Sequence, residues 1–349
     1  PSRVLVCDDS ALMRNMLSAV LNQQPDMEMA GTAPDAFIAR ELIKQLNPDV
    51  LTLDIDMPRM DGLEFLSRLM RLRPMPVIMI SSLTTRGSKA TLSALEHGAV
   101  DFLPKPEHRA AENIESWGQQ VVEKIRIAAR AKLNLRSQRT RPILAGIPVR
   151  QQSIIAIGSS TGGTEALRQV LMPLPVSTPG IVIAQHMPSG FTHSFAQRLD
   201  SLCQIAVREA QDGEPVLPGT ALIAPGDRHL DIIGQDHGYR VRLSAAPAVN
   251  RNRPSVAVLF DSVARQASKH ASAALLTGMG ADGARGLLHL RQTGAFTLAQ
   301  SEATCVVFGM PREAIALGGA KKVVDLDDIS QCLLDSFHYK NASTKDVRR

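Results

Sequence analysis

The sequence contains no uninterrupted apolar run of about 20 residues, the length that a membrane-spanning helix needs. Its first ten residues, PSRVLVCDDS, have the pattern of a buried strand and lack the apolar segment of a secretory signal peptide. We therefore expect a cytoplasmic protein that is not inserted in a membrane. Cysteine is scarce, and its four copies lack the paired spacing of a zinc site, so we expect them to be reduced, small apolar residues.

Acidic residues are missing between Lys124 and Arg150, a stretch that holds eight basic residues. Without these eight, the formal net charge falls from +5 to −3, so the rest of the chain is not the basic surface that nucleic acids attract. Prolines and glycine in the same stretch interrupt a helix. We expect a basic linker over residues 126–151. The sequence leaves open whether it only tethers two domains or also touches an acidic partner surface.

The length of 349 residues favours two domains, because one hydrophobic core rarely grows so large. In the N-terminal half, four short apolar runs are typical of strands buried on both faces of a parallel sheet: VLVC (4–7), DVLTLD (49–54), VIMISS (77–82) and VDFLPK (100–105). Ser10 and Asp35 stand at helix N-cap positions, and Gly98 ends the helical segment that begins near Ser88. Five βα units, and so a doubly wound α/β fold, fit residues 1–125.

Polar side chains follow these runs where each strand ends. Asp8 and Asp9 come after the first run and Asp54 ends the next, while Ser81 and Lys105 end the last two. Ligands of doubly wound sheets bind at the carboxyl ends of the strands, so we expect these residues to converge. Three carboxylates repel one another unless a hard cation lies among them, which indicates Mg²⁺. A single aspartate there is more often a helix cap, but five residues at matching strand ends are not independent.

The motifs DDS, LDIDMPRMDG, SS and KP resemble the receiver domains of two-component response regulators, which have a flavodoxin-like fold, over residues 1–125. The resemblance implies that Asp54 accepts a phosphoryl group from a histidine kinase. It also implies that Mg²⁺ is bound by Asp8, Asp9, Asp54 and the backbone carbonyl of Asp56. The residues that respond to the phosphoryl group would be Ser81, Lys105 and the switch aromatic Phe102.

The C-terminal half begins with a strand pattern, SIIAIG, that leads into the glycine-rich turn GSSTGGTEAL. Thr164 stands where a Walker A loop needs lysine, and no acidic residue between Glu165 and Asp200 could bind a dinucleotide ribose. The turn does match G-x-S-x-G around Ser160, a strand-to-helix turn that exposes a serine hydroxyl. This short motif alone is a frequent chance match.

Two further strand ends supply partners for Ser160. His186 ends the apolar run GIVIAQH, and Asp282 lies in the glycine-rich loop of SAALLTGMGADG. A hydroxyl, an imidazole and a carboxylate at one edge of a sheet are what acyl transfer requires. Each residue also has a structural interpretation, as a core histidine bound to backbone or a helix-capping aspartate. His229, in APGDRHL, competes with His186 for the role of base.

The blocks IGSSTGGTEAL, QHMPSGFT, APGD, NRNRPSV, LTGMGADGARG and CVVFGMPREAI resemble the catalytic domain of protein-glutamate methylesterases. The resemblance implies a doubly wound, mostly parallel α/β hydrolytic domain over residues 152–349 with the triad Ser160, His186 and Asp282. It also implies that the Met279 backbone N–H contributes to the oxyanion hole, with Thr161 beside the nucleophile. Ser159 stands where a small alanine is expected.

With both halves in this order, the chain resembles the chemotaxis response regulators that are protein-glutamate methylesterases. This implies a phosphorylation-activated enzyme that releases methanol from glutamate methyl esters on chemotaxis receptors and deamidates receptor glutamines. Mg²⁺ belongs only to the receiver, and hydrolysis needs no cofactor. The expected partners are the receptors and the chemotaxis histidine kinase, with no nucleic acid, and we expect a monomer. A receiver-controlled nucleotide- or DNA-binding output, or an inactive hydrolase fold used only for interaction, is the alternative.

Overall fold

The computed structural model describes residues 1–106, 111–133 and 141–342. The chain divides into two compact units, Pro1–Arg136 and Ser137–Arg349. In the ranges just given, no helix combines the length and apolar character needed to cross a membrane.

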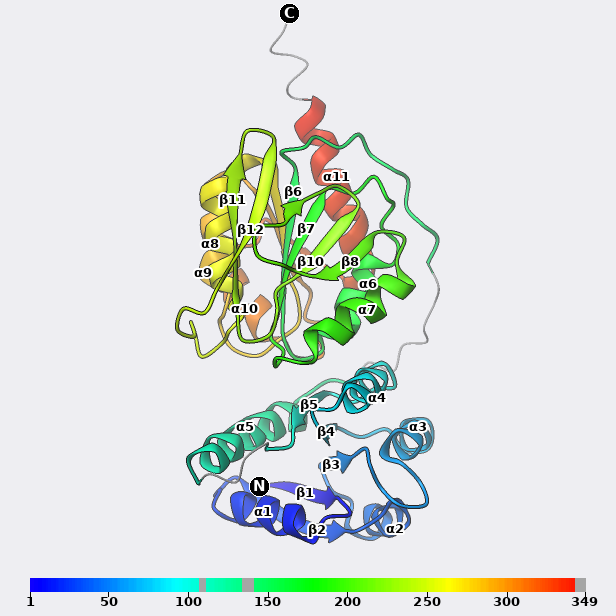
Figure 1. The fold of residues 1–349 in the computed structure, drawn as a ribbon. Coiled ribbons are helices and arrows are strands. Elements are labelled where there is room, and N and C mark those ends of the chain that lie inside the picture. Colours follow the sequence, from blue (N-terminus) through cyan, green and yellow to red (C-terminus); the bar gives the residue numbers. More distant parts are fainter. Residues whose placement is uncertain (107–110, 134–140, 343–349) are drawn as a thin grey trace, which may run out of the picture. The chain divides into compact units, whose positions relative to one another are not determined.

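The first unit is a five-stranded parallel sheet in the order β2-β1-β3-β4-β5. Helices α1 and α5 pack on one face and α2, α3 and α4 on the other (Figure 1). Its elements are β1 (Ser2–Cys7), α1 (Ala11–Asn22), β2 (Met27–Ala33), α2 (Ala36–Leu46), β3 (Val50–Asp54), α3 (Gly62–Leu72), β4 (Val77–Ser81), α4 (Thr85–Glu96), β5 (Asp101–Pro104) and α5 (Ala111–Ala129). The predicted doubly wound fold is confirmed.

Local signals set the helix ends of this unit. The Asp35 carboxylate accepts a hydrogen bond from the Ile38 backbone N–H at 2.9 Å, and Ser10 caps α1 in the same way. Gly98 follows α4 with a φ of 108°, a conformation that costs glycine little. These caps agree with the sequence-based predictions. Because all five strands are parallel, their carboxyl ends lie at one edge of the sheet.

The second unit contains a seven-stranded parallel sheet in the order β15-β14-β13-β6-β7-β10-β8 and a three-stranded antiparallel sheet, β11-β12-β9. Helices α8 and α9 cover one face of the larger sheet, and α6, α7 and α11 cover the other (Figure 1). Its main elements are β6 (Ile154–Ser159), α6 (Gly163–Leu171), β7 (Gly180–Gln185), α7 (Thr192–Leu202), β8 (Ala206–Glu209), β9 (Pro215–Val216), β10 (Thr220–Ile223), β11 (His229–Gln235), β12 (Gly238–Ser244), α8 (Val256–Gln266), β13 (Ala271–Leu275), α9 (Ala284–Gln292), β14 (Phe296–Gln300), α10 (Met310–Ala316), β15 (Lys322–Val324) and α11 (Ile329–Ala342). Short 3₁₀ helices follow α8 and β15, at Ser268–His270 and Leu326–Asp328.

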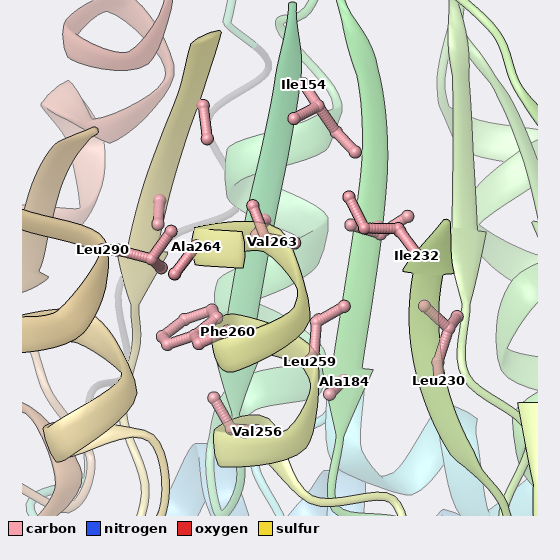
Figure 2. Close-up of a cluster of buried hydrophobic side chains, with 14 of the residues drawn as sticks. Ile154, Ala184, Leu230, Ile232, Val256, Leu259, Phe260, Val263, Ala264 and Leu290 are labelled. Atoms are coloured by element: carbon pink, nitrogen blue, oxygen red, sulfur yellow. The ribbon is translucent and has the colours of Figure 1, made fainter. Parts of the chain in front are cut away.

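Helix α8 organises the core on its side of this sheet. Figure 2 shows the helix lying across strands β6 and β7, with β11 beside it. Phe260 is fully buried in this cluster, with Leu290 from α9 and Ile232 from β11. Gly158 at the end of β6 lies so close to Val256 that an added Cβ would come within 2.2 Å of a Val256 methyl group. This packing fixes the first turn of α8 at the carboxyl ends of the strands.

The basic segment between the units is bound at both of its described ends. Arg126, inside α5, forms an ion pair with Asp26 at 2.7 Å. Arg141 pairs with Asp327 at 2.6 Å within the second unit, and Ile147 of the same unit is buried. Two of its basic residues, Arg136 and Arg139, lie outside the described residues.

Candidate functional site

Three carboxylates meet at the carboxyl edge of the first sheet. Asp8, Asp9 and Asp54 each place an oxygen within 4.8 Å of the others. Asp8 and Asp54 are buried, and Asp9 is exposed. The Lys105 ammonium lies 2.8 Å from Asp54 Oδ2 and 3.3 Å from Asp8 Oδ2. One cation therefore faces three acids.

The electrostatics of this cluster favour binding a further cation. Burial, and then the nearby Asp8 carboxylate, raise the pKa of Asp54 to about 6. Burial also raises the pKa of Asp8, although Lys105 opposes this effect. Asp8 Oδ2 is buried, and among the described residues its partner is the Lys105 ammonium, 3.3 Å away. Three carboxylate oxygens within 4.8 Å of one another, balanced by one ammonium group, suit Mg²⁺, so the residues present fit that ion.

The other predicted residues of the first unit lie around this cluster. The Asp56 backbone N–H donates to Asp54 Oδ1 at 3.3 Å, which places the Asp56 backbone next to the cluster. The Ser81 hydroxyl is buried and donates to the Gly87 carbonyl at 3.4 Å, near the start of α4. Phe102 is buried in β5. The Ser81 hydroxyl is thus bonded to backbone carbonyls, and Phe102 belongs to the core of the unit.

In the second unit, Ser160 occupies the turn between β6 and α6. Its backbone N–H donates to the Thr277 carbonyl at 3.0 Å, and its carbonyl accepts from the Gly163 N–H at 2.7 Å. Gly162 has a φ of 79°, which lets the chain turn sharply into α6. Ser160 is partly exposed, whereas Ser159 is fully buried and donates its hydroxyl hydrogen to Gln185. Ser160 is therefore the accessible hydroxyl of this turn.

His186 and Asp282 form a hydrogen-bonded pair. His186 Nε2 lies 2.6 Å from Asp282 Oδ2, and the carboxylate is buried to 3% exposure. Burial opposes ionisation of Asp282, but hydrogen bonds from His186, from Asn250 and from the Val256 amide hold its pKa below the usual value. Asp282 therefore stays charged and can stabilise an imidazolium.

The N-terminus of α8 supplies most of the remaining hydrogen bonds to this carboxylate. The backbone N–H groups of Val256 and Ala257 donate to it at 2.8 and 3.1 Å, and the Ser255 hydroxyl donates at 2.8 Å. The positive end of a helix dipole also favours an anion at this position. Asp282 is both the partner of His186 and the cap of a helix distant in sequence.

His229, the other histidine considered as base, has no free ring nitrogen. Its Nδ1 accepts from the Ser255 backbone N–H at 3.2 Å, and its Nε2 donates to the Pro247 carbonyl at 2.9 Å. The ring is buried to 1% exposure. The acids near it are paired with arginines, Asp227 with Arg253 and Asp231 with Arg242. His229 holds the loop before α8 in place and does not face Asp282.

The turn that carries Met279 approaches the nucleophile closely. A Cβ on Gly278 would lie 2.6 Å from Ser160 Cβ. Gly278 is held by hydrogen bonds at both its N–H and its carbonyl, whereas the Met279 backbone N–H has no acceptor among the described residues. The Thr161 carbonyl accepts from the Thr277 hydroxyl at 3.0 Å, which ties this turn to the residue after Ser160. Met279 thus offers a free donor near Ser160.

Three residues that the sequence did not single out contact this site. Asn250 donates its side-chain amide to Asp282 at 3.0 Å, Thr277 accepts from Ser160, and Gln185 bonds to both Ser159 and Ser160. The block NRNRPSV and the position of Gln185 directly before His186 were weak signals for two of them. Nothing local distinguishes Thr277, whose role depends on tertiary contacts.

Comparisons with known proteins match both units. The model of the response regulator receiver domain matches residues 4–113, and that of the CheB methylesterase matches residues 155–333. The solved structure of the Thermotoga maritima CheB methylesterase catalytic domain is 40% identical, with a TM-score of 0.51. The match covers 55% of this chain and 99% of the Thermotoga maritima catalytic domain.

Curated relatives match along nearly the whole chain. A protein-glutamate methylesterase/protein-glutamine glutaminase of Escherichia coli strain K12 is 58% identical over 334 residues, 95% of this chain and 96% of the relative. Its counterpart in Pectobacterium atrosepticum is 58% identical over 335 residues, with the same coverage. The chain belongs to the protein-glutamate methylesterase/protein-glutamine glutaminase family.

Proposed function

We propose that this protein is a phosphorylation-activated serine hydrolase that acts on the methylated glutamates and on specific glutamines of chemotaxis receptors. The observation that carries the hydrolase assignment is the hydrogen-bonded His186–Asp282 pair, whose carboxylate is buried, next to the turn that holds the accessible Ser160. The choice of receptor glutamate as substrate is supported by the relatives named above. A nucleotide- or DNA-binding output is not favoured, since the CheB methylesterase model covers the output unit.

In the first step, Ser160 Oγ attacks the γ-carbonyl carbon of the methyl ester while His186 takes the hydroxyl proton. His186 Nε2 is bonded to Asp282, which leaves Nδ1 as the nitrogen that receives the proton. The tetrahedral intermediate then expels methoxide, which leaves as methanol with the proton from His186. The product is an acyl-enzyme on Ser160.

Water completes the reaction. His186 removes a proton from the water, the hydroxide adds to the acyl carbon, and Ser160 leaves with the proton returned to it. The glutamate carboxylate is released. A glutamine side chain follows the same steps, with ammonia in place of methanol. In both steps the Met279 N–H donates to the oxyanion, since the Ser160 N–H is already bonded to Thr277.

In the receiver, we assign Asp54 as the acceptor of a phosphoryl group from the chemotaxis histidine kinase. Asp8, Asp9, Asp54 and the Asp56 carbonyl would hold Mg²⁺, which when bound neutralises charge on the phosphoryl oxygens. Lys105, already 2.8 Å from Asp54, contacts a phosphoryl oxygen. Ser81 and Phe102 respond by repositioning, as the resemblance to receiver domains implies.

The receiver is further proposed to inhibit the catalytic unit until Asp54 is phosphorylated. This follows from the order of the domains and from the family. The isolated catalytic unit, residues 148–349, is then expected to release methanol from methylated receptors faster than the unphosphorylated full chain. Equal rates would rule out this inhibition.

Substitution of the serines tests the hydrolase assignment. Ser160→Ala is expected to lower methanol release by about 10⁶-fold, the typical cost of removing a triad serine. Ser159→Ala is the matched control, since Ser159 is the buried neighbour, and it should keep at least about a tenth of the rate. A Ser160→Ala variant as active as the parent would place the nucleophile elsewhere.

A further inference from the structure

The side chain of Gln185 connects the strand ends that carry Ser160 and His186. Gln185 is the last residue of β7 and is 3% exposed. Its Nε2 donates to the Ser160 carbonyl at 3.0 Å and to the His186 carbonyl at 3.2 Å. Its Oε1 accepts from the Ser159 hydroxyl at 2.5 Å. One amide group therefore bonds to the backbone of both the nucleophile and the base.

These contacts fix the orientation of the amide. Both hydrogens of Nε2 face carbonyl oxygens, so a flipped amide would place Oε1 against two acceptors. The neighbouring chain leaves space for this arrangement only because residue 163 is glycine. A Cβ there would lie 2.3 Å from Gln185 Oε1 and 2.6 Å from Ser159 Cβ. The buried amide thus has three partners and one orientation.

We propose that Gln185 is a positioning residue for the hydrolysis and that it holds Ser160 and His186 at the separation needed for proton transfer. The inference rests on the proposed function, in which Ser160 is the nucleophile and His186 the base. The Ser160 peptide is held by Thr277 at its N–H and by Gln185 and Gly163 at its carbonyl. His186 donates its N–H to the Ser159 carbonyl at 3.1 Å, so Gln185 completes the link between the two strands.

Two substitutions at Gln185 in the full chain separate its functions. Gln185→Leu removes all three hydrogen bonds at similar volume, and Gln185→Glu keeps an acceptor for Ser159 while losing the paired donors. Both should lower kcat for methanol release about 10²-fold or more, because small misplacements of reacting groups have effects of this size. KM for methylated receptor should change less than about threefold, because Gln185 is buried behind the site and does not reach substrate.

A second measurement reports the nucleophile without the receptor. A fluorophosphonate probe reacts with Ser160 Oγ as fluoride leaves and His186 takes the proton, so its rate should fall in parallel with kcat in both variants. Ser159→Ala removes only the hydrogen bond that Gln185 accepts. It should lower kcat for methanol release and the rate of the probe reaction by at most about tenfold.

A control variant measures the effect of lost stability alone. Thr297, buried at the start of β14, donates its hydroxyl to the Gly319 carbonyl at 2.6 Å, at the opposite end of the strands from the site. Thr297→Val should lower the unfolding temperature and leave kcat within about twofold. The inference is overturned if the Gln185 variants keep the parent kcat, or lose no more than Thr297→Val. Activity in Ser160→Ala, measured in parallel, would instead overturn the proposed function itself.

Discussion

At the scale of single residues, the reactivity of the site depends on how hydrogen bonds set the charge of Asp282. The carboxylate accepts from His186, Asn250, Ser255 and the first N–H groups of α8. All of these partners are donors, so an ionised carboxylate satisfies them and a neutral amide cannot. The position therefore requires an acid.

Asp282→Asn keeps the shape of the side chain but presents an NH₂ group to N–H donors. We expect kcat to fall by about 10⁴-fold, the size of the effect seen when a triad aspartate becomes asparagine, because His186 loses its orienting acceptor. The measurement is methanol release with the unfolding temperature recorded in parallel. Asp261→Asn is the control, since Asp261 pairs with His289 near the surface, at 3.2 Å. A loss below tenfold in Asp282→Asn would contradict the assigned role.

The raised pKa of Asp54 makes the stability of the receiver depend on pH. The pKa of Asp54 rises from 3.8 in the unfolded chain to about 6 in the folded receiver. The contribution of this group to folding stability is therefore fully present below pH 3.8 and is lost as the pH rises through 6. In Mg²⁺-free buffer, Asp54→Asn should therefore stabilise the receiver at about pH 7.5 by on the order of 2 kcal/mol, and the gain should disappear near pH 4.

Fluorescence of Trp117, the only tryptophan of the chain, reports this transition in the full protein. Trp117 lies in α5, is buried, and donates its Nε1–H to the Pro104 carbonyl at 2.8 Å. A gain of the same size at both pH values would show that Asp54 has an ordinary pKa in the folded receiver.

At the scale of elements, the position of α8 connects the core to the site. Gly158→Ala should push the first turn of α8 away from β6, because the new methyl group meets Val256 at 2.2 Å. We expect a loss of about 1–3 kcal/mol in stability from overpacking and a lower kcat, since the same turn holds Asp282. Val256→Ala in the same chain removes the opposing methyl groups. The double variant should be more stable than Gly158→Ala alone, and purely additive losses would exclude the contact as the cause.

Elements set by local signals could be predicted, and those set by distant contacts could not. The Ser10 and Asp35 caps, four strands of the first sheet, and β6, β7 and β13 of the second follow from short-range pattern, whereas the buried strands β10 and β14 were not predicted. Strand β2, at a sheet edge, has an exposed Glu28 and no continuous apolar run, so periodicity did not reveal it. The antiparallel β11-β12-β9 sheet was not expected either.

The same distinction holds for the site. Strand ends indicated Ser160, His186 and Asp282, because parallel strands bring their carboxyl ends to one edge. Gln185 and Asn250 act through hydrogen bonds to residues that only the fold brings near them. Apart from the block NRNRPSV and the place of Gln185 directly before His186, the sequence carries no signal for these bonds.

At the scale of the whole molecule, the two compact units carry separate chemistries, and metal binding should affect only one. Adding Mg²⁺ should raise the midpoint of the unfolding transition that Trp117 fluorescence reports. At an Mg²⁺ concentration one hundred times Kd, the free energy of unfolding of the receiver should increase by about 2.7 kcal/mol. Asp9→Asn should abolish most of this gain without disturbing the core, since Asp9 is the exposed member of the cluster. The isolated catalytic unit serves as control, and a similar stabilisation of that unit by Mg²⁺ would contradict the assignment.

We propose that phosphorylation of Asp54 controls hydrolysis at Ser160. The most direct test follows methanol release from methylated receptor membranes, with and without a small-molecule phosphodonor and Mg²⁺, for the parent chain, Asp54→Asn and Ser160→Ala. We predict that the phosphodonor accelerates release by the parent, has no effect on Asp54→Asn, and produces no methanol with Ser160→Ala. Equal acceleration of Asp54→Asn would show that Asp54 does not control the enzyme, and continued release by Ser160→Ala would show that Ser160 is not the nucleophile.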